Sequence, residues 1–376
     1  MSAQKPQLSE QAEISALTIG PGASLNDAFG HSAFRVKDPV LGTDLVFNYG
    51  VYDFDTPNFY LKFAQGKLNY LIGVNYYEDF YESYVSQNRS IKEQVLNLNV
   101  SEKQTLYTYL LNNIKPENRA YLYDFFYDNC ATRIRDVLQV AAENPIVYNN
   151  PPDFEPKTFR QLIHDHINFN SWGALGIDIA LGSVIDSEAT PYEYMFLPEY
   201  IFEFFEAATF DNSSNKAVVK QTHILFDKVA QPESHSFFTS PLFFLSMLSV
   251  LVLYITFMDF KKHRRTKWLD AVIFIITGLI GIFILLLWFA TDHTGTHQNY
   301  NLLWAFALNI IVISQLLKEQ PANWFVKYLK LLVILLCLLT LHWLIGVQVF
   351  APVLIPILIA LAVRYIFLIK LFSEER

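Results

Sequence analysis

The chain has 376 residues, of which 52% are hydrophobic, and its formal net charge is −8. Residues 1–240 carry 17 basic and 30 acidic side chains, a net of −13, whereas residues 241–376 carry 11 and 6, a net of +5. The acidic front half offers no basic stripe for nucleic acid. One of the only two cysteines lies in an apolar run, which excludes a disulfide framework in the soluble part.

The front half alternates short strand patterns with short helical patterns. Residues 12–22 are strand-like and end in a Pro-Gly turn. GHSAFRV (30–36) and LVFNYG (45–50) flank a Pro/Gly loop and predict a β-hairpin. A short helix is expected at 56–66, strands at 67–76 and 90–100 with a helix between them, and a helix capped by Ser101 and Gln104. This order predicts an α+β domain over residues 1–235.

The back half contains five apolar runs, at 241–258, 268–290, 302–317, 324–345 and 349–369. Most of them approach the roughly 20 residues that cross a bilayer, so residues 236–376 are predicted to form an all-α bundle of about five transmembrane helices. The linker KKHRRTK (261–267) holds five Lys or Arg, and the 291–301 loop holds none. The positive-inside rule therefore places 261–267 and the C-terminus in the cytoplasm and the front domain outside.

An exported front domain requires an export signal, and the chain begins MSAQKPQ, without the charged and apolar segments of one. We therefore expect that a signal peptide ended just before the Ala3-Gln4 region and that Met1 is not native.

Cys130 is the candidate nucleophile. It lies in DNCATRIRD (128–136), where an aromatic, strand-like run stops and a helical pattern begins. A thiol in the first turn of a helix faces unpaired N–H groups and the positive end of the helix dipole, which favours the thiolate. The N–H of Cys130 is also a candidate donor to an oxyanion. The alternative is a partly buried structural cysteine, and Cys337 is interpreted as a small hydrophobic side chain in the membrane.

His31 is the candidate general base, because it heads a strand pattern in the same predicted domain as Cys130. Strand alternation puts His31, Ala33 and Arg35 on one face. A thiol enzyme needs a base within hydrogen-bond reach and a third group that orients the base. Asn48 on the paired strand is the first candidate for this third group and Tyr49 the second. A packing role in the hairpin is the alternative for both.

The loop TDHTGTHQNYN (291–301) is a second polar cluster, close to two predicted membrane ends. His293 and Asn299 are candidates for binding a lipid headgroup near the thiol. A solvated interfacial loop is the simpler alternative, and a metal site that includes His297 is a third. We predict neither a metal nor any other cofactor.

Three residues near the two motifs are further candidates for binding substrate. Arg35 lies in the strand of His31, Arg133 lies in the helix of Cys130, and Asn129 precedes the thiol. The guanidinium groups suit a phosphate. Ordinary salt bridges in an acidic domain are the alternative for both arginines.

These motifs together resemble a known family. FGHSAFRV (29–36), NYG (48–50) and DNCATRIRD are similar to the exported domain of bacterial Lnb-type lipoprotein N-acyltransferases, which are permuted relatives of the NlpC/P60 (papain-like) thiol enzymes. FLPEYIFEF (196–204), the 291–301 loop and the tail of several spans are similar as well. The resemblance implies a permuted papain-like domain on the periplasmic side of the bacterial inner membrane, with Cys130 and His31 as the catalytic pair.

The resemblance also implies a reaction. Cys130 would take an acyl chain from a phospholipid as a thioester, with His31 moving the proton. The α-amine of a diacylglyceryl-cysteine lipoprotein would then accept the chain. Two other functions stay open: a membrane-anchored thiol peptidase or amidase that acts on cell-wall peptides, and a non-catalytic membrane receptor with a papain-like binding domain. The spans hold almost no charge, which argues against a transport path.

Overall fold

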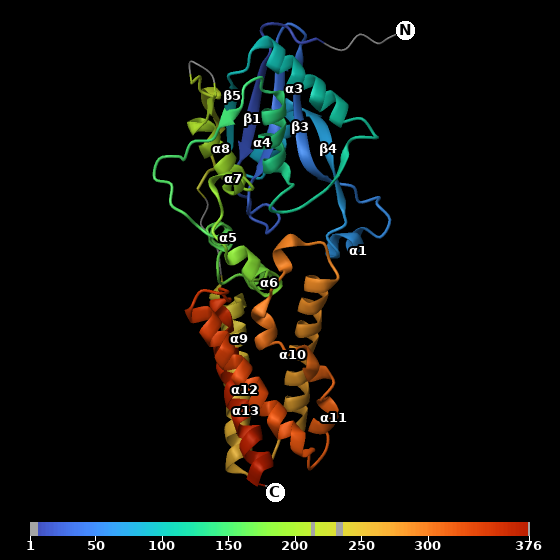
Figure 1. Cartoon of the computed structure of the whole chain (residues 1–376), viewed down its shortest axis with the longest axis vertical. Helices are drawn as coiled ribbons and strands as arrows, with labels where there is room; N and C mark the ends of the chain where they lie inside the picture. The colour runs from blue at the N-terminus through green and yellow to red at the C-terminus, as the bar shows by residue number, and fades with distance from the viewer. Residues whose placement is uncertain (1–6, 212–214, 231–235, 375–376) are drawn as a thin grey trace. The chain divides into compact units, whose positions relative to one another are not determined.

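The computed structural model describes residues 7–211, 215–230 and 236–374, and the chain folds into two compact units (Figure 1). Unit 1 comprises residues 1–157 and 188–232, and unit 2 comprises residues 158–187 and 233–376. The units thus divide the chain differently from the single boundary at 235 that the sequence suggests, because residues 158–187 pack with the helices of unit 2. The expected end of an export signal, within residues 1–6, lies outside the described residues.

Unit 1 is built on a seven-stranded sheet in the order β6-β4-β3-β2-β1-β5-β9, in which every neighbouring pair is antiparallel. The strands are β1 (Glu13–Ile19), β2 (His31–Asp38), β3 (Thr43–Tyr52), β4 (Asn69–Tyr76), β5 (Ile91–Leu96), β6 (Ala120–Leu122) and β9 (Val219–Phe226), and a separate pair joins β7 (Ile146–Val147) to β8 (Thr209–Phe210). The predicted α+β domain with a β2–β3 hairpin is confirmed.

Helices cover both faces of the sheet of unit 1. The helices of unit 1 are α1 (Phe59–Ala64), α2 (Tyr77–Ser86), α3 (Val100–Asn113), α4 (Cys130–Ala141), α7 (Pro191–Tyr194) and α8 (Pro198–Ala207). On one face, α4 packs on β2 and β3, and the Phe47 ring meets the Tyr107 ring of α3. On the other face, Phe80 of α2 packs on Ala33 and Val46. Strand alternation therefore sends His31 and Ala33 to the face of α2, and Phe47 to the face of α3 and α4.

One sequence prediction on the helices of unit 1 needs correction. The capping box of α3 is formed by Asn99 and Glu102, not by Ser101 and Gln104, because the helix begins at Val100. The aromatic segment 192–207 contributes to the core, where Tyr194, Phe204 and Phe205 are at most 1% exposed.

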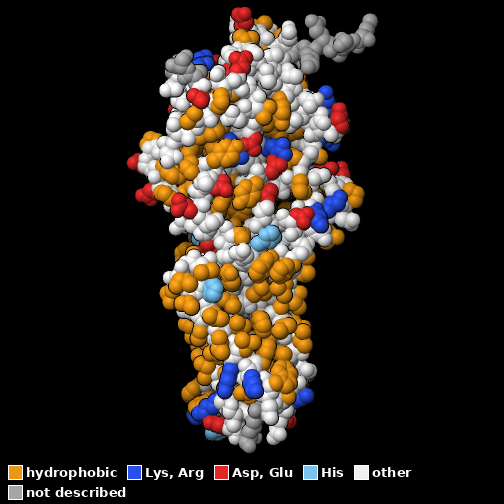
Figure 2. All heavy atoms as spheres, in the orientation of Figure 1, with side chains coloured by type: hydrophobic (Ala, Val, Ile, Leu, Met, Phe, Trp, Pro, Cys, Tyr) orange, Lys and Arg blue, Asp and Glu red, His pale blue; other side chains and the backbone are white. Residues whose placement is uncertain are grey.

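Among its described residues, unit 2 has four helices that are long and apolar enough to cross a membrane: α9 (Pro241–Lys261), α10 (Lys267–Phe289), α12 (Asn323–Leu344) and α13 (Ile355–Glu374). The last apolar stretch begins at Pro352, in the 3-10 turn before α13. Shorter pieces are α5 (Phe159–His164), α6 (Trp172–Ala180), α11 (Ile313–Leu316) and six 3-10 turns, η1 (Ser183–Asp186), η2 (Phe237–Thr239), η3 (Thr294–Thr296), η4 (Tyr300–Leu303), η5 (Ala307–Ile310) and η6 (Pro352–Leu354). Apolar side chains cover the surface of the long helices, and Lys and Arg side chains gather at the end of the helix bundle where the C-terminus lies (Figure 2).

The predicted segment 302–317 is not one regular helix. This segment is broken into η4, η5 and α11. Polar side chains within it bond to neighbouring segments, as when Asn309 donates to Thr277 Oγ1 at 2.8 Å and accepts from the Tyr328 hydroxyl at 2.6 Å. A Cβ on Gly281 of α10 would lie 2.1 Å from the carbonyl oxygen of Ala305. Glycine thus lets the broken backbone lie directly against α10.

The broken segment still runs from one end of the helix bundle to the other. At its start, Asn299 bonds to the carbonyl of Ile179, and at its end the carbonyls of Leu316 and Lys318 accept from Arg265, in the basic linker between α9 and α10. The segment therefore replaces the regular third span of the prediction with an irregular crossing.

One charged side chain lies well inside the last predicted span. Arg364 of α13 is fully buried and donates to Asp270 of α10 at 2.7 Å and to Asp259 of α9 at 2.8 Å. These buried ion pairs join three helices near the basic linker, and breaking one would leave an unpaired buried charge.

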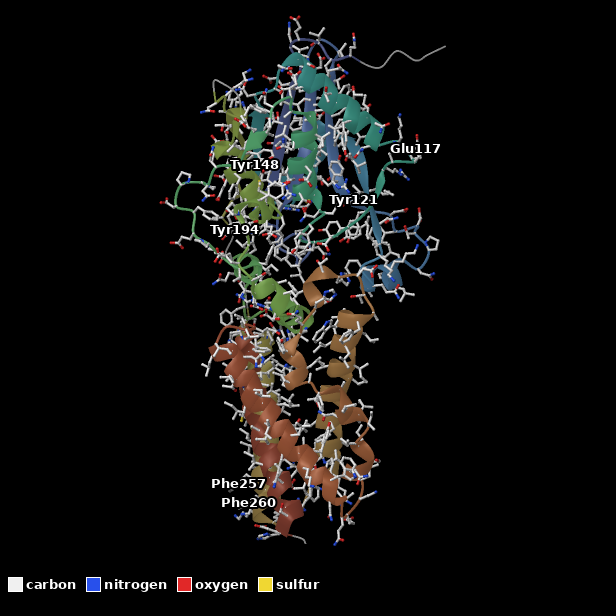
Figure 3. All side chains as sticks on the ribbon, in the orientation of Figure 1. Glu117, Tyr121, Tyr148, Tyr194, Phe257 and Phe260 are labelled. Carbon is white, nitrogen blue, oxygen red and sulfur yellow. The ribbon has the colours of Figure 1, made fainter. Side chains whose placement is uncertain are left out.

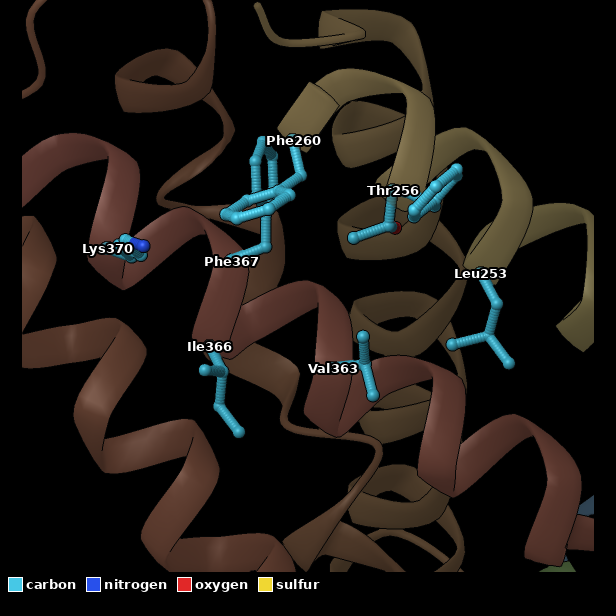
Figure 4. A pocket seen from close by; sticks show the side chains of 8 residues that line it. Leu253, Thr256, Phe260, Val363, Ile366, Phe367 and Lys370 are labelled. Atoms are coloured by element: carbon cyan, nitrogen blue, oxygen red, sulfur yellow. The ribbon is translucent and has the colours of Figure 1, made fainter. Parts of the chain in front are cut away.

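A groove of about 300 Å³ lies between α9 and α13 (Figure 4). Its lining consists mostly of apolar side chains: Leu253, Thr256, Phe257, Phe260, Val363, Ile366, Phe367 and Lys370. The groove belongs to the membrane helices and contains none of the candidate catalytic residues.

Candidate active site

Cys130 is the first residue of α4, and the residue before it fixes this helix start. Asn129 is only 3% exposed. Its amide accepts hydrogen bonds from the N–H groups of Ala131 (2.8 Å) and Thr132 (3.0 Å) and donates to the carbonyls of Phe125 (2.6 Å) and Phe196 (2.8 Å). The cap therefore joins the start of α4 to two other segments of unit 1. The backbone N–H of Cys130 is a further hydrogen-bond donor at this N-terminal end of the helix.

His31 begins β2 and lies beside Asn48 of β3. Because Asn48 is paired with Ala33 in the antiparallel register, its side chain lies on the same face as His31. Nε2 of His31 donates to Oδ1 of Asn48. The Tyr84 ring of α2 stacks on the imidazole at a centroid distance of 6.3 Å. The ring is thus held in one orientation, and Nδ1 is left for another partner.

The thiol of Cys130 lies close enough to the imidazole of His31, and to the backbone N–H groups of Ser32 and Ala131, for these groups to favour its ionised form. Burial opposes ionisation of the thiol, but His31, first through its charge, and the two backbone N–H groups outweigh burial and lower the pKa of Cys130. Burial likewise opposes the charge on the imidazole, yet Cys130 and the bond to Asn48 raise the pKa of His31. Both shifts favour a thiolate–imidazolium pair.

Gly50 and Tyr121 border the thiol. Gly50 follows Tyr49 at a bulge of β3 and has φ 91°, a backbone conformation that favours glycine. A Cβ on Gly50 would lie 3.8 Å from Cβ of Cys130 and 4.0 Å from the hydroxyl of Tyr121. Tyr121 lies on β6 (Figure 3), and its buried hydroxyl has no hydrogen-bond partner among the described residues. Burial, and then the nearby Cys130, raise the pKa of Tyr121, so its proton stays available for donation.

Two other predicted residues of unit 1, Tyr49 and Arg35, have their polar groups engaged away from the Cys130–His31 pair. Tyr49 points to the opposite face from Asn48, where its hydroxyl donates to Asn113 at 3.0 Å. Arg35 is paired with Asp44 at 2.7 Å and with Glu93 at 3.1 Å. Thus Asn48, but not Tyr49, contacts the imidazole, and the Arg35 guanidinium is engaged in ion pairs.

Arg133 contacts Tyr121, which borders the thiol. Its Nε donates to Asp128 at 2.5 Å, and its guanidinium lies 4.4 Å from the centroid of the Tyr121 ring. Arg133 therefore holds Tyr121 from the side of α4.

The two predicted residues of the 291–301 loop belong to unit 2. Asn299 is fully buried and donates to the carbonyls of Ile179 and Ala180. The loop backbone also accepts from Gly182, whose N–H bonds to the carbonyl of Gly295 at 2.9 Å. His293 is partly exposed. The loop is thus fixed to residues 179–182, and a substrate role of its side chains stays a prediction.

Sequence reasoning missed Gly50, Tyr84 and Tyr121 as neighbours of the thiol. Only Gly50 carried a usable signal, since it ends the NYG motif. No three His, Cys, Asp or Glu side chains within residues 7–211, 215–230 and 236–374 are close enough together to hold a metal ion.

The comparisons with known proteins agree with this architecture. The family model of the Lnb N-terminal periplasmic domain matches residues 7–165, and that of the Lnb transmembrane domain matches residues 232–375. No curated protein and no solved structure matches the chain. The two family models match in the order in which the soluble sheet domain and the long apolar helices occur. The chain therefore belongs to the Lnb family and is a membrane protein with a periplasmic N-terminal domain.

Proposed function

We propose that this chain is a lipoprotein N-acyltransferase, which moves an acyl chain from a phospholipid, through a thioester on Cys130, to the α-amine of a diacylglyceryl-cysteine lipoprotein. The observation that supports this most is the contact of the helix-start thiol with His31, whose imidazole Asn48 orients. A nucleophile, a base and an orienting group are the parts that thiol acyl transfer requires. Membrane helices in the same chain suit two substrates that are both anchored in lipid.

In the first half-reaction, the Cys130 thiolate attacks the ester carbonyl of the phospholipid. The negative charge that develops on the carbonyl oxygen can be bound by the N–H of Cys130 and by the hydroxyl of Tyr121. When the tetrahedral intermediate collapses, the ester C–O bond breaks and the leaving lysophospholipid oxygen takes the proton of the His31 imidazolium. The products are an acyl-thioester on Cys130, a neutral His31 and a lysophospholipid.

In the second half-reaction, the amine of the lipoprotein attacks the thioester. Neutral His31 accepts a proton from the attacking nitrogen, the C–S bond breaks, and the thiolate–imidazolium pair is restored. Asn48 holds the imidazole in place through both steps, because its oxygen accepts from Nε2 and leaves Nδ1 to exchange protons. The sum is aminolysis of an ester, which needs no redox partner.

We also infer that the periplasmic domain is a permuted papain-like fold. A helix that begins with the cysteine packs on an antiparallel sheet, and neighbouring strands of that sheet carry the histidine and the asparagine. The histidine strand precedes the cysteine helix in the chain, which is the order of the permuted relatives.

A two-substrate transfer assay tests the proposal. The full chain in lipid nanodiscs is supplied with a phospholipid carrying a labelled acyl chain and with a synthetic diacylated lipopeptide. Cys337→Ser, which changes an exposed cysteine of unit 2, should transfer label at the wild-type rate, whereas Cys130→Ser should transfer none. Release of free labelled fatty acid without label on the lipopeptide would indicate a hydrolase. Undiminished transfer by Cys130→Ser would rule out the thioester.

A further inference from the structure

The connection between β3 and β4 carries an unusual number of exposed aromatic side chains. We call residues 52–64 the aromatic finger; it contains α1, no residue of which is buried. In this finger Phe54 is 71% exposed, Tyr60 82% and Leu61 57%. Figure 1 shows α1 and its loops projecting from the strands of unit 1. Large apolar side chains that are exposed together on one element mark an interaction site.

The aromatic finger is a built element. Asn58, which precedes α1, and Gly66, which follows its C-cap, have φ 58° and 68°. After α1, the N–H of Lys67 bonds to the carbonyl of Lys62 at 2.8 Å and the N–H of Gly66 bonds to that of Phe63 at 3.1 Å, which closes the helix as a left-handed C-cap does. The exposed rings are therefore presented by a defined turn of helix.

Ring contacts connect the aromatic finger to the neighbourhood of Cys130. The ladder consists of adjacent ring pairs with these centroid distances: Tyr60–Phe59 5.3 Å, Phe59–Phe54 4.9 Å, Phe54–Tyr52 5.6 Å, Tyr52–Tyr70 4.8 Å and Tyr70–Tyr123 4.1 Å. Burial, and then the charge of Cys130, raise the pKa of Tyr123, which places this last ring within electrostatic range of the thiol. A continuous series of ring contacts thus leads from the exposed Tyr60, through the buried Tyr70, to a ring near the candidate nucleophile.

We propose that the aromatic finger inserts its exposed rings into the outer leaflet of the membrane. Tyrosine and phenylalanine at this density favour the boundary between headgroups and acyl chains, where an aromatic ring contacts both. The finger offers a single basic residue, Lys62, beside Asp53 and Asp55, so apolar contact rather than attraction to anionic lipid must supply the binding. Since the domain is periplasmic and tethered by membrane helices, the outer leaflet is always within reach.

Insertion of the finger would also serve the proposed acyl transfer, but the membrane contact itself does not depend on that function. A phospholipid ester has to leave the headgroup layer to reach Cys130, and the ladder of rings offers its acyl chain an apolar path. Only this use of the contact rests on the proposed acyl transfer.

Labelling tests the membrane contact independently of any activity. In a Cys130→Ser, Cys337→Ser background, a fluorophore is attached to Tyr60→Cys in nanodiscs. The matched control is Leu41→Cys, which is 54% exposed in the β2–β3 turn, at the other end of a ten-residue strand and so about 30 Å away. Brominated lipid should quench the label at 60 at least threefold more than the label at 41, at low and high salt alike. Equal quenching at the two sites would overturn the proposal, and so would protection of the label at 60 from both lipid and iodide.

Transfer assays then test the use of the contact. Tyr60→Asp should lower acyl transfer from bilayer phospholipid at least tenfold, whereas Leu41→Asp should not. Neither change should alter the alkylation of Cys130 by iodoacetamide. If wild-type protein forms no thioester, the proposed function fails while the labelling result still decides the membrane contact. If it does form one and Tyr60→Asp transfers normally, the path along the finger is refuted.

Discussion

Asn129 fixes the position of the nucleophile, and two substitutions separate the contributions of its hydrogen bonds. Asn129→Ala removes both the helix cap and the two donations to the carbonyls of Phe125 and Phe196. Asn129→Ser keeps an oxygen that can cap α4 but cannot donate to the carbonyls of both Phe125 and Phe196. If Asn129 instead bound substrate, as the sequence suggested, its substitution would raise the KM for lipid without changing stability.

The structure gives the magnitude of the Asn129 effect. Loss of an N-cap costs about 1 kcal/mol, and each buried carbonyl left without its donor adds about 1 kcal/mol. We therefore expect Asn129→Ala to lower the free energy of unfolding of unit 1 by about 3 kcal/mol and Asn129→Ser by about 2 kcal/mol. For a domain of this size, about 3 kcal/mol corresponds to a fall of roughly 6–12 °C in the melting temperature.

The assay combines thermal unfolding of the full chain with hydrogen–deuterium exchange of residues 125–141. Faster exchange at the start of α4 should accompany the fall in melting temperature, and iodoacetamide should alkylate Cys130 more slowly because the thiol is no longer held against His31. A variant Asn129→Ala with wild-type melting temperature and exchange, but a raised KM for lipid, would refute the reasoning and restore the substrate-binding interpretation.

Three further outcomes follow from the site and the helix bundle. Because His31 lowers the pKa of Cys130, the rise of the iodoacetamide alkylation rate with pH should move to higher pH in His31→Ala. In the wild type, the rate of acyl transfer should rise through the lowered pKa of the thiol and fall again as the pH passes the raised pKa of the imidazole. Tyr121→Phe removes a buried hydroxyl without a partner among the described residues, so thermal stability should hold or rise while single-turnover acylation slows about a hundredfold. Gly281→Ala should destabilise unit 2 by roughly 1–3 kcal/mol in thermal unfolding, whereas Gly176→Ala, which has open space around it, should not.

Local sequence signals were sufficient for the parts of the site that depend on one element. Strand alternation and the hairpin put His31 and Asn48 on one face, and the break in the aromatic run marked the start of α4 at Cys130. The contact between His31 and Cys130 joins two elements about 100 residues apart. No periodicity encodes such a contact, and the resemblance to a family supplied it.

The errors of sequence reasoning have physical causes of the same kind. Residues 302–317 are as apolar as a span, but Asn301 and Asn309 bond to side chains and carbonyls of other segments, and this tertiary bonding replaces the regular helix. Tyr121 comes near Cys130 because the short strand β6 pairs with β4 at the edge of the sheet, and a tyrosine-rich sequence does not reveal that pairing.

The mass of the protein after contact with lipid tests the central claim most directly. The full chain, in the form Cys337→Ser, is incubated with phospholipid of a single acyl composition without any acceptor, and its intact mass is measured. The account predicts one added acyl chain on Cys130 that neutral hydroxylamine removes and that the lipopeptide discharges in a single turnover. An unmodified Cys130 in protein that nevertheless acylates the lipopeptide would contradict it.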